Sequence, residues 1–196
     1  MFTETLLQQI SQDLYQQGFS LQQQAAPNAL CTALLNRLQT RQAQQPFQAA
    51  KIGRQQTLQS NEQVRNDRIL WLDGAHAAEQ QYCAWLTQLQ QHLNRQFYLG
   101  LTHFESHYAV YQPGDFYKKH VDAFKGQSNR KVSLVLYLNE NWRQSDGGEL
   151  LLHTEQPLRF LPQFASFALF MSDEIAHEVL PSHKTRYSIA SWFRVD

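Results

Sequence analysis

The sequence predicts a single α+β domain with a mainly β core, in which helices from the N-terminal half cover a β-sandwich or jelly roll of short strands. Its 196 residues are enough for one full hydrophobic core, and the hydrophobic share of 42% is that of a globular chain. The first half, to about residue 95, has apolar residues at helical spacing, whereas the second half has many short strand-like runs.

Three helices are predicted in the first half. Apolar residues recur at helical spacing from Leu6 to Tyr15, and Pro27 stands near the start of a second periodic run that extends to Leu38. A third run covers about residues 75–94. The many glutamines are interspersed with the periodic leucines, so they form polar helix faces and not a low-complexity tract. One side of the third helix carries Tyr82, Trp85, Leu86, Leu89 and Leu93.

A polar segment at residues 53–67 separates the second and third helices, between strand-like runs at 47–52 and 69–72. A long polar loop inside a compact domain is often a mobile functional element. The composition alone fits an inert surface loop equally well.

Seven short strands are predicted in the second half, separated by turns rich in glycine and proline. Two of them, at 132–138 and 187–193, are apolar on both faces. A strand buried on both sides needs cover on its outer face, and the three helices can supply it. The predicted strands are 98–112, 117–121, 131–139, 149–153, 164–171, 177–179 and 186–194.

The charge balance and the cysteine count bear on partners and compartment. Lys+Arg and Asp+Glu are both 17, which argues against a dedicated nucleic-acid binder with a basic surplus. Two cysteines form no disulfide framework and no metal-binding spacing. The N-terminal residues do not resemble a signal peptide, and no apolar run is long enough to span a membrane. We therefore expect a cytoplasmic protein with no membrane partner.

Three His-x-acid triplets occur, which is unremarkable for a chain with 8 histidines and 17 acidic residues. In a strand, residues i and i+2 point to the same face, so each triplet could contribute two metal ligands. The triplets are His103-Phe-Glu105, His120-Val-Asp122 and His153-Thr-Glu155.

Context distinguishes the triplet at His120 and Asp122. His177 and Arg186 follow it in an order for which a β-sandwich would place all of these residues at the same open end. Two histidines and one carboxylate form the facial triad that holds Fe(II) with open positions, whereas structural zinc takes four closed ligands. An arginine nearby could grip a dicarboxylate with two parallel hydrogen bonds. Taken singly, each histidine fits a satisfied polar residue at a strand end, and Arg186 fits a surface ion pair.

Several further motifs occur in order between about Val64 and Phe193. With them, the chain resembles the Fe(II)- and 2-oxoglutarate-dependent dioxygenases, and among them the prolyl 4-hydroxylases of the oxygen-sensing type and their bacterial relatives. The resemblance implies a double-stranded β-helix with the N-terminal helices packed on its major sheet. It also implies one domain over 1–196, with a helical extension at about 1–45 and a catalytic core at about 46–194. The motifs are Val64-Arg-Asn-Asp-Arg-Ile-Leu-Trp-Leu-Asp-Gly74, Tyr111-Gln-Pro-Gly114, His120-Val-Asp122, Leu136-Tyr-Leu-Asn139, Trp142 with Gly147-Gly-Glu-Leu150, His177-Glu-Val179 and Arg186-Tyr-Ser-Ile-Ala-Ser-Trp-Phe193.

The resemblance implies that His120, Asp122 and His177 bind Fe(II) and form the catalytic centre. It implies that 2-oxoglutarate chelates the metal while Arg186 and the hydroxyl of Tyr137 hold its distal carboxylate. The expected reaction consumes O2, converts 2-oxoglutarate to succinate and CO2, and hydroxylates the substrate, with ascorbate as an optional further cofactor. The remaining positions expected to line the co-substrate pocket are Tyr111 and Trp192.

The expected substrate is a protein or peptide that carries a target proline. The polar loop that ends at residues 65–67 matches the family's mobile substrate-covering loop. Arg65 and Asp67 stand where the family orders this loop, and Arg130 matches a position near the substrate entrance. Without the resemblance, all three are ordinary surface charges.

Three alternatives are kept. The same fold could hydroxylate a free amino acid or another small molecule. A nucleic-acid demethylase of the superfamily would show Arg-x5-Arg after the distal histidine, whereas seven residues separate Arg186 from Arg194 here. A non-catalytic binding module could retain the fold, but it would need neither a complete triad nor Arg186 with Tyr137. Conversion of 2-oxoglutarate to succinate distinguishes an enzyme from such a module.

Overall fold

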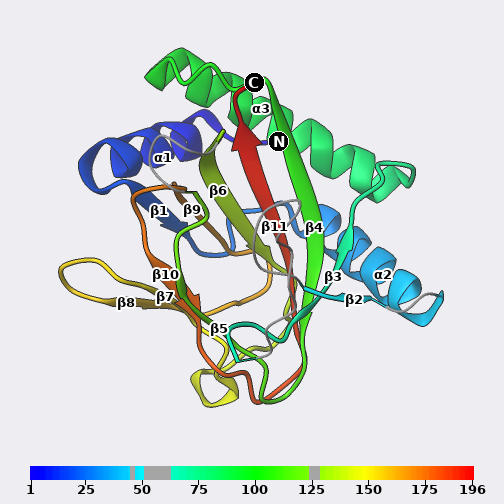
Figure 1. Cartoon of the computed structure of the whole chain (residues 1–196). Helices are drawn as coiled ribbons and strands as arrows, with labels where there is room; N and C mark the ends of the chain where they lie inside the picture. Colours follow the sequence, from blue (N-terminus) through cyan, green and yellow to red (C-terminus); the bar gives the residue numbers. More distant parts are fainter. Residues whose placement is uncertain (45–46, 51–62, 124–128) are drawn as a thin grey trace.

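The computed structural model describes residues 1–44, 47–50, 63–123 and 129–196, and within them two antiparallel sheets lie face to face (Figure 1). The helices are α1 (Glu4–Gln17), α2 (Asn28–Gln44), α3 (Ala77–Phe97) and the short 3-10 helix η1 (Gln144–Asp146). The larger sheet runs in the spatial order β1 (Phe19–Gln22), β9 (Phe167–Met171), β6 (Arg130–Tyr137), β11 (Arg186–Arg194), β4 (His103–Tyr111), β3 (Arg68–Trp71) and β2 (Gln48–Ala49). The smaller sheet runs in the order β5 (Tyr117–His120), β10 (His177–Val179), β7 (Leu150–Leu152) and β8 (Leu158–Phe160).

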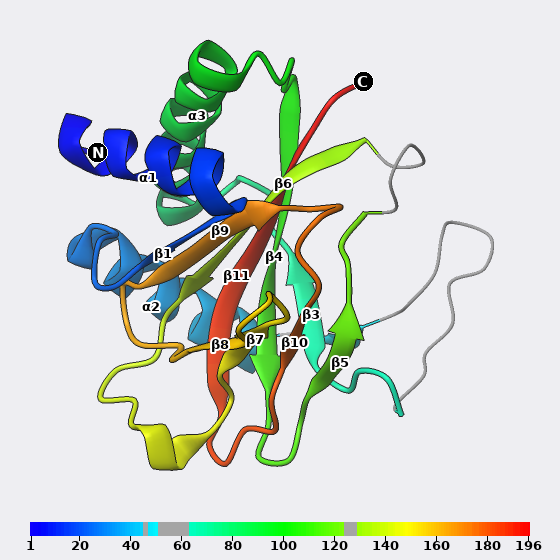
Figure 2. The same cartoon turned by 90° about the vertical axis from the view of Figure 1, so that its left-hand side faces the viewer.

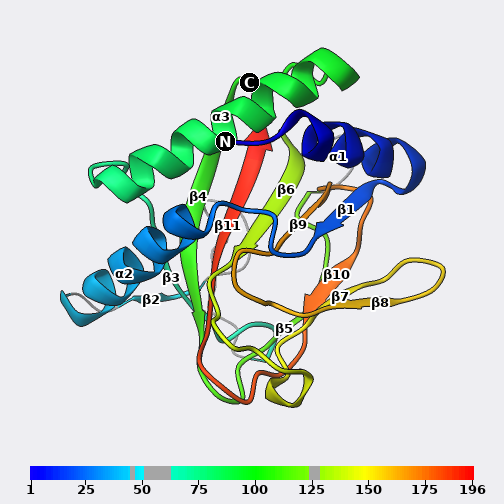
Figure 3. The same ribbon diagram turned by 180° about the vertical axis from the view of Figure 1, so that it is seen from behind.

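All three α-helices pack on the outer face of the larger sheet, and the smaller sheet covers its inner face (Figures 2 and 3). Local signals set the ends of two of them. Thr3 caps α1 by accepting a hydrogen bond from the backbone N–H of Leu6, and Gly18 ends that helix with a left-handed φ of 76°. His76 caps α3 through the N–H of Ala78, and Tyr98 ends it in a left-handed conformation.

The central strands β6 and β11 are buried on both faces, as their composition predicts. On the outer face, Leu134, Leu136 and Ile189 are fully buried in a core shared with the helices. On the inner face, Tyr137 packs in a second cluster with residues of the smaller sheet. The five apolar residues predicted on one side of the third helix are all buried in α3. The predicted helical cover is therefore confirmed.

Two short strands were not predicted. β1 lies within the expected helical extension over residues 1–45, and it pairs with β9 through Phe19 and Phe170 to become an edge of the larger sheet. Its four residues include Ser20, whose fully buried hydroxyl donates to Asp13 Oδ2 at 2.7 Å. β8 has three residues and, among the strands that the structure describes, pairs with β7 alone. Such short strands are defined by partners distant in sequence and carry no readable alternation of their own.

Other predicted strands were longer than the observed ones. The run at 98–112 contracts to β4, since Tyr98 ends α3 and Gly100 also has a positive φ of 66°. Most of the predicted polar loop, residues 53–62, and the end of the strand at 47–52 lie outside the described residues. In the parts of the chain that are described, no helix combines the length and the apolar character needed to cross a bilayer.

We expect Phe167→Ala to lower the free energy of unfolding by about 3–5 kcal/mol, because it empties a site at the interface of helices and sheet. The Phe167 ring is fully buried, and its edge meets Trp85 with ring centroids 5.6 Å apart. Tyr15→Ala is the control, since Tyr15 is 85% exposed and its loss should change stability by less than about 0.5 kcal/mol. Urea denaturation followed by circular dichroism measures both, and similar values for the two variants would contradict this packing.

Candidate active site

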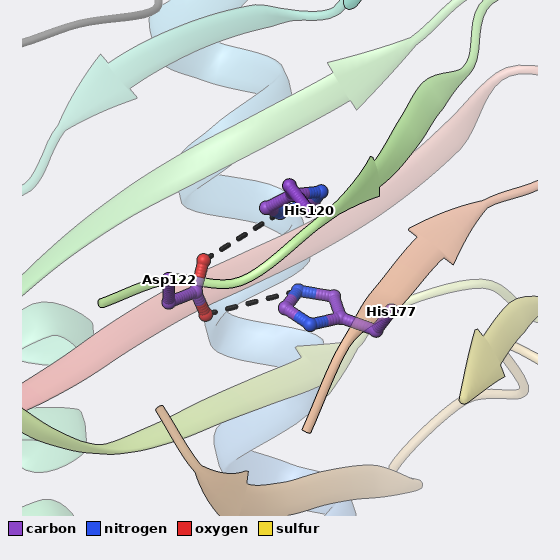
Figure 4. Close-up of side chains that lie close together, drawn as sticks. All are labelled: His120, Asp122 and His177. Atoms are coloured by element: carbon purple, nitrogen blue, oxygen red, sulfur yellow. Dashed lines mark ion pairs between the residues drawn. The ribbon is translucent and has the colours of Figure 1, made fainter. Parts of the chain in front are cut away.

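Three predicted ligand residues meet between the two sheets. His120 ends β5, His177 begins β10, and these two residues are paired in the β10–β5 ladder. Asp122 follows two residues after His120, beyond the end of the strand. One ligand atom from each residue lies within 4.8 Å of the others, and Figure 4 shows the two imidazoles directed at the carboxylate.

Backbone carbonyls orient both imidazoles. His120 Nδ1 lies 2.8 Å from the carbonyl of Lys118, and His177 Nδ1 lies 3.0 Å from that of Ile175. A carbonyl only accepts, so each neutral ring carries its proton on Nδ1 and leaves Nε2 free to bind a metal. The Nε2 atoms of His120 and His177 lie 3.5 and 3.7 Å from the Asp122 oxygens, too long for good hydrogen bonds.

Protonation states agree with a metal site. Burial lowers the pKa of His177, which favours the neutral imidazole that binds metals. Burial alone would raise the pKa of Asp122, but His177, His120 and a hydrogen bond from Ser133 together hold it well below its usual range. The site therefore offers an ionised carboxylate beside two imidazoles whose Nε2 atoms face it, a ligand set that fits Fe(II) with open positions.

Arg186 begins β11 and is only 1% exposed. Its guanidinium lies between the rings of Tyr111 and Tyr137, 4.9 and 5.1 Å from their centroids. Its Nε donates to the carbonyl of Gly148 at 2.9 Å, and Nη1 donates to Ser188 Oγ at 3.2 Å. In the described part of the chain, Nη2 and the Tyr137 hydroxyl have no hydrogen-bond partner.

Two buried donors without acceptors are costly, so they indicate a ligand that supplies the acceptors. Burial raises the pKa of Tyr137 to about 12 even though Arg186 opposes the shift, and its hydroxyl therefore keeps its proton. An arginine beside a protonated phenol fits a carboxylate. These residues therefore fit the distal carboxylate of 2-oxoglutarate.

Gly148 leaves space for the arginine. A Cβ at this position would lie 3.0 Å from Arg186 Cδ and 3.0 Å from Ser182 Oγ, and the backbone φ of +69° is one that other residues rarely adopt. Gly148, the second glycine of the Gly-Gly motif before β7, therefore makes room for the Arg186 side chain.

The inner face of β11 extends from Arg186 towards the metal residues. Ser188 and Ala190 follow Arg186 on this face, and their small side chains leave room beside the arginine. Trp192 comes last and pairs in register with Ser133, whose hydroxyl contacts Asp122. The structure therefore places Trp192 at the metal end of the row, whereas Tyr111 and Tyr137 flank the arginine.

Arg65 and Asp67 form a buried ion pair next to the metal residues. Arg65 Nε and Nη2 donate to the two Asp67 oxygens at 2.8 and 2.7 Å, and Asp67 is fully buried. The Arg65 guanidinium lies 4.3 Å from the Tyr117 ring centroid. The Tyr117 ring in turn stacks on His120 with centroids 3.6 Å apart. These contacts connect the end of the polar loop to a metal ligand.

Arg130 lies beside Trp192. Its guanidinium is 4.0 Å from the Trp192 ring centroid, and its Nε donates to Glu105 Oε1 at 2.9 Å. The Trp192 ring centroid also lies 5.2 Å from that of His107 and 6.4 Å from that of Trp71, a tryptophan that is 47% exposed. Arg130 therefore belongs to a mostly buried aromatic cluster at the metal end of β11.

The other two triplets have different partners. Glu105 forms ion pairs with Arg130 and Arg194. His103 Nδ1 lies 3.3 Å from Asp196 Oδ1. His153 Nε2 lies 3.2 Å from Glu178. Among the described residues, only the triplet at His120 joins a metal-binding group.

Sequence reasoning gave no role to Tyr117, Ser133 or Gly148. Tyr117 and Ser133 contact a ligand residue each, and Gly148 contacts Arg186. Ser133 had a readable signal: it is a polar residue at an inward position of a strand that is apolar on both faces. Tyr117 had none, because its contact with Arg65 joins residues 52 positions apart.

Solved prolyl hydroxylases resemble this chain over nearly its whole length. A prolyl-4-hydroxylase from Pseudomonas putida is 36% identical, with a TM-score of 0.88 over 97% of this chain and 99% of the other. A Trichoplax adhaerens prolyl hydroxylase, solved with a peptide of the oxygen degradation domain of hypoxia inducible factor, is 26% identical. Its TM-score is also 0.88, over 97% of this chain and 90% of the other.

Human Egl nine homolog 1 is 29% identical over 145 residues, which cover 68% of this chain and 34% of that protein. The chain thus spans about a third of this relative's length. The profile of the 2OG-Fe(II) oxygenase superfamily matches residues 106–194. The chain belongs to this superfamily, in the group that contains the prolyl 4-hydroxylases. The likeness confirms the predicted double-stranded β-helix, and the family's cofactors are Fe(II), 2-oxoglutarate and O2.

We expect Arg65→Ala to lower the free energy of unfolding by about 3–5 kcal/mol, since it leaves the buried Asp67 carboxylate without its partner. Arg41→Ala is the matched control: the Arg41–Asp73 pair has the same 2.7 Å separation, but the Asp73 side chain is 48% exposed. That change should cost less than about 1 kcal/mol. Guanidinium chloride denaturation measures both variants, and equal losses would show that burial of Asp67 does not matter.

Proposed function

We propose that this protein is a 2-oxoglutarate-dependent dioxygenase that hydroxylates a prolyl residue of a protein or peptide. One observation carries the proposal: His120, Asp122 and His177 meet between the same two sheets as the donors of Arg186 and Tyr137, which have no acceptor in the described part of the chain. A metal-ligand set alone would fit many proteins. The additional buried carboxylate site points to a dicarboxylate co-substrate.

The three ligand residues would hold Fe(II), and Arg186 with Tyr137 would hold the distal carboxylate of 2-oxoglutarate. Bound metal and co-substrate together supply the oxidising chemistry, in which O2 and 2-oxoglutarate yield succinate, CO2 and a hydroxylated product. The protein orients both groups. Fixed imidazole tautomers keep Nε2 unprotonated for the metal, and the protonated Tyr137 donates to the co-substrate. The inner face of the sheet excludes water because Arg186, Tyr111 and Tyr137 are all buried.

A peptide substrate is supported by the relatives. The Trichoplax adhaerens protein was solved with a peptide fragment, and the Pseudomonas putida protein is a prolyl-4-hydroxylase. In this chain, Arg65 and Asp67 would order the substrate-covering loop, and Arg130 with Trp192 would border the entrance. We infer a cytoplasmic location, which is supported by Cys31 and Cys83 both being free.

The first test is succinate formation from 2-oxoglutarate by the Fe(II)-loaded enzyme. His120→Ala should abolish it, because two ligands cannot hold the metal in a productive geometry. His153→Ala is the control and should retain wild-type turnover, since His153 pairs with Glu178 outside the metal group. Wild-type turnover by His120→Ala would disprove the metal assignment. Absence of turnover in the wild-type protein, with and without proline-containing peptides, would favour a non-catalytic binding module.

The second test addresses the substrate. Cell extract is incubated with the iron-loaded enzyme or with the His120→Ala variant, and peptides are searched by mass spectrometry for the gain of one oxygen atom. A gain confined to proline in the wild-type sample is expected. Gains on another side chain, or on free amino acids, would redirect the assignment while leaving the dioxygenase chemistry in place.

We expect Tyr137→Phe to raise the KM for 2-oxoglutarate about 10–150-fold, since it removes one donor worth about 1.5–3 kcal/mol to a charged acceptor. The same change should leave stability without co-substrate unchanged or slightly higher, because it removes a buried hydroxyl that has no partner in the described part of the chain.

Tyr82→Phe is the matched control. Tyr82 is equally buried, but its hydroxyl lies 2.8 Å from Ser191 Oγ on the opposite face of the sheet. It should lose stability by about 1 kcal/mol and keep the KM of the wild type. A KM unaffected by Tyr137→Phe would show that this hydroxyl does not contact the co-substrate.

A further inference from the structure

Two serine hydroxyls lie in a row behind the Asp122 carboxylate. Ser133, on the inner face of β6, donates to Asp122 Oδ2 at 2.7 Å. Ser172, the residue after β9, has its Oγ 2.8 Å from Ser133 Oγ. Both serines are buried, with exposures of 1% and 0%. Buried hydroxyls beside a metal-ligand carboxylate are placed to affect the ligand.

The protons in this row have one consistent direction. Ser133 donates to Asp122 Oδ2, so its single hydroxyl proton points at that oxygen. The Ser133 oxygen must then accept from Ser172 in their 2.8 Å contact. Ser172 therefore orients the Ser133 hydroxyl, and Ser133 orients the carboxylate.

Asp122 needs such support more than the two histidines do. Each histidine belongs to a strand and is oriented by the carbonyl two residues before it in sequence. Asp122 lies past the end of β5 and is outside every strand ladder formed by the described residues. Its neighbour Ala123 donates its backbone N–H to the carbonyl of Ser172 at 3.0 Å. Ser172 thus holds this segment through its carbonyl and also supports Ser133 through its hydroxyl.

We propose that Ser133 and Ser172 are positioning residues that set the orientation of the Asp122 carboxylate for metal binding. The hydroxyl of Ser133 fixes Oδ2, which lies 3.7 Å from His177 Nε2, and thereby also sets the position of Oδ1, which lies 3.5 Å from His120 Nε2. Outer groups that orient metal ligands typically change metal affinity by about 10–100-fold when they are removed. The inference concerns metal binding alone and does not depend on proline being the target.

The test is titration of the metal-free full chain with Co(II), followed by its visible absorption. Ser133→Ala should weaken Co(II) binding about 10–100-fold and alter the absorption spectrum, because the carboxylate is free to rotate. Ser133→Thr keeps a hydroxyl and should restore the affinity to within about 3-fold of the wild type. Ser172→Ala should give a smaller loss, and the double alanine variant should be no weaker than Ser133→Ala, because Ser172 acts through Ser133.

Ser106→Ala is the matched control. Ser106 Oγ and Ser191 Oγ are also 2.8 Å apart and buried, but the partner of this pair in the described part of the chain is the Tyr82 hydroxyl of α3 and not a residue of the metal group. Thermal unfolding of the metal-free proteins compares stabilities. The proposal predicts similar unfolding temperatures for Ser133→Ala and Ser106→Ala, with a change in Co(II) affinity and spectrum only for the former.

Three results would overturn it: wild-type Co(II) affinity in Ser133→Ala, equal affinity loss in Ser106→Ala, or no rescue by Ser133→Thr in a folded protein. Should Ser133→Ala fail to fold, Ser172→Ala decides, and an unchanged affinity and spectrum in that variant would refute the row of hydroxyls. Failure to hydroxylate proline would leave the Co(II) results unaffected, so the two proposals can fail separately.

Discussion

The two ladders of β11, with β4 on one side and β6 on the other, are the constraint on which the site depends. They pair Arg186 with Tyr111, Ser188 with Tyr137 and Trp192 with Ser133. Because side chains alternate between faces, a slip of one residue in β11 would turn its inward row into the helix-packed core. The helices prevent that slip, since Ile189 and Phe193 on the other face are fully buried against them.

Stability and function use opposite faces of the same strands. The outer face of the larger sheet carries apolar side chains and satisfied hydroxyls such as the Tyr82–Ser191 pair. The inner face carries a guanidinium and a phenol whose donors lack acceptors in the described part of the chain. Buried donors without acceptors lower the stability of the folded protein, so the apolar core on the outer face has to offset this cost.

Sequence reasoning was successful where a pattern is local or where the resemblance orders several motifs. The strands that are apolar on both faces required a covering layer, and the helices at 4–17, 28–44 and 77–97 provide it. Spacing alone could not separate the three triplets, but context favoured the one at His120, and among the described residues this is the triplet that lies beside a second histidine, His177. What sequence could not supply are contacts between distant residues: β1 against β9, Tyr117 between Arg65 and His120, and the hydroxyls of Ser133 and Ser172 behind Asp122. Each depends on the three-dimensional packing and leaves no periodic trace.

The position of Asp122 has a mechanical consequence. Both histidines belong to the smaller sheet, whereas the side chain of Asp122 is held by residues of the larger sheet and its flank. A cation bound by all three residues would therefore link the two layers of the sandwich. Separation of the layers would then have to break coordination bonds, so metal occupancy and closure of the sandwich are thermodynamically coupled.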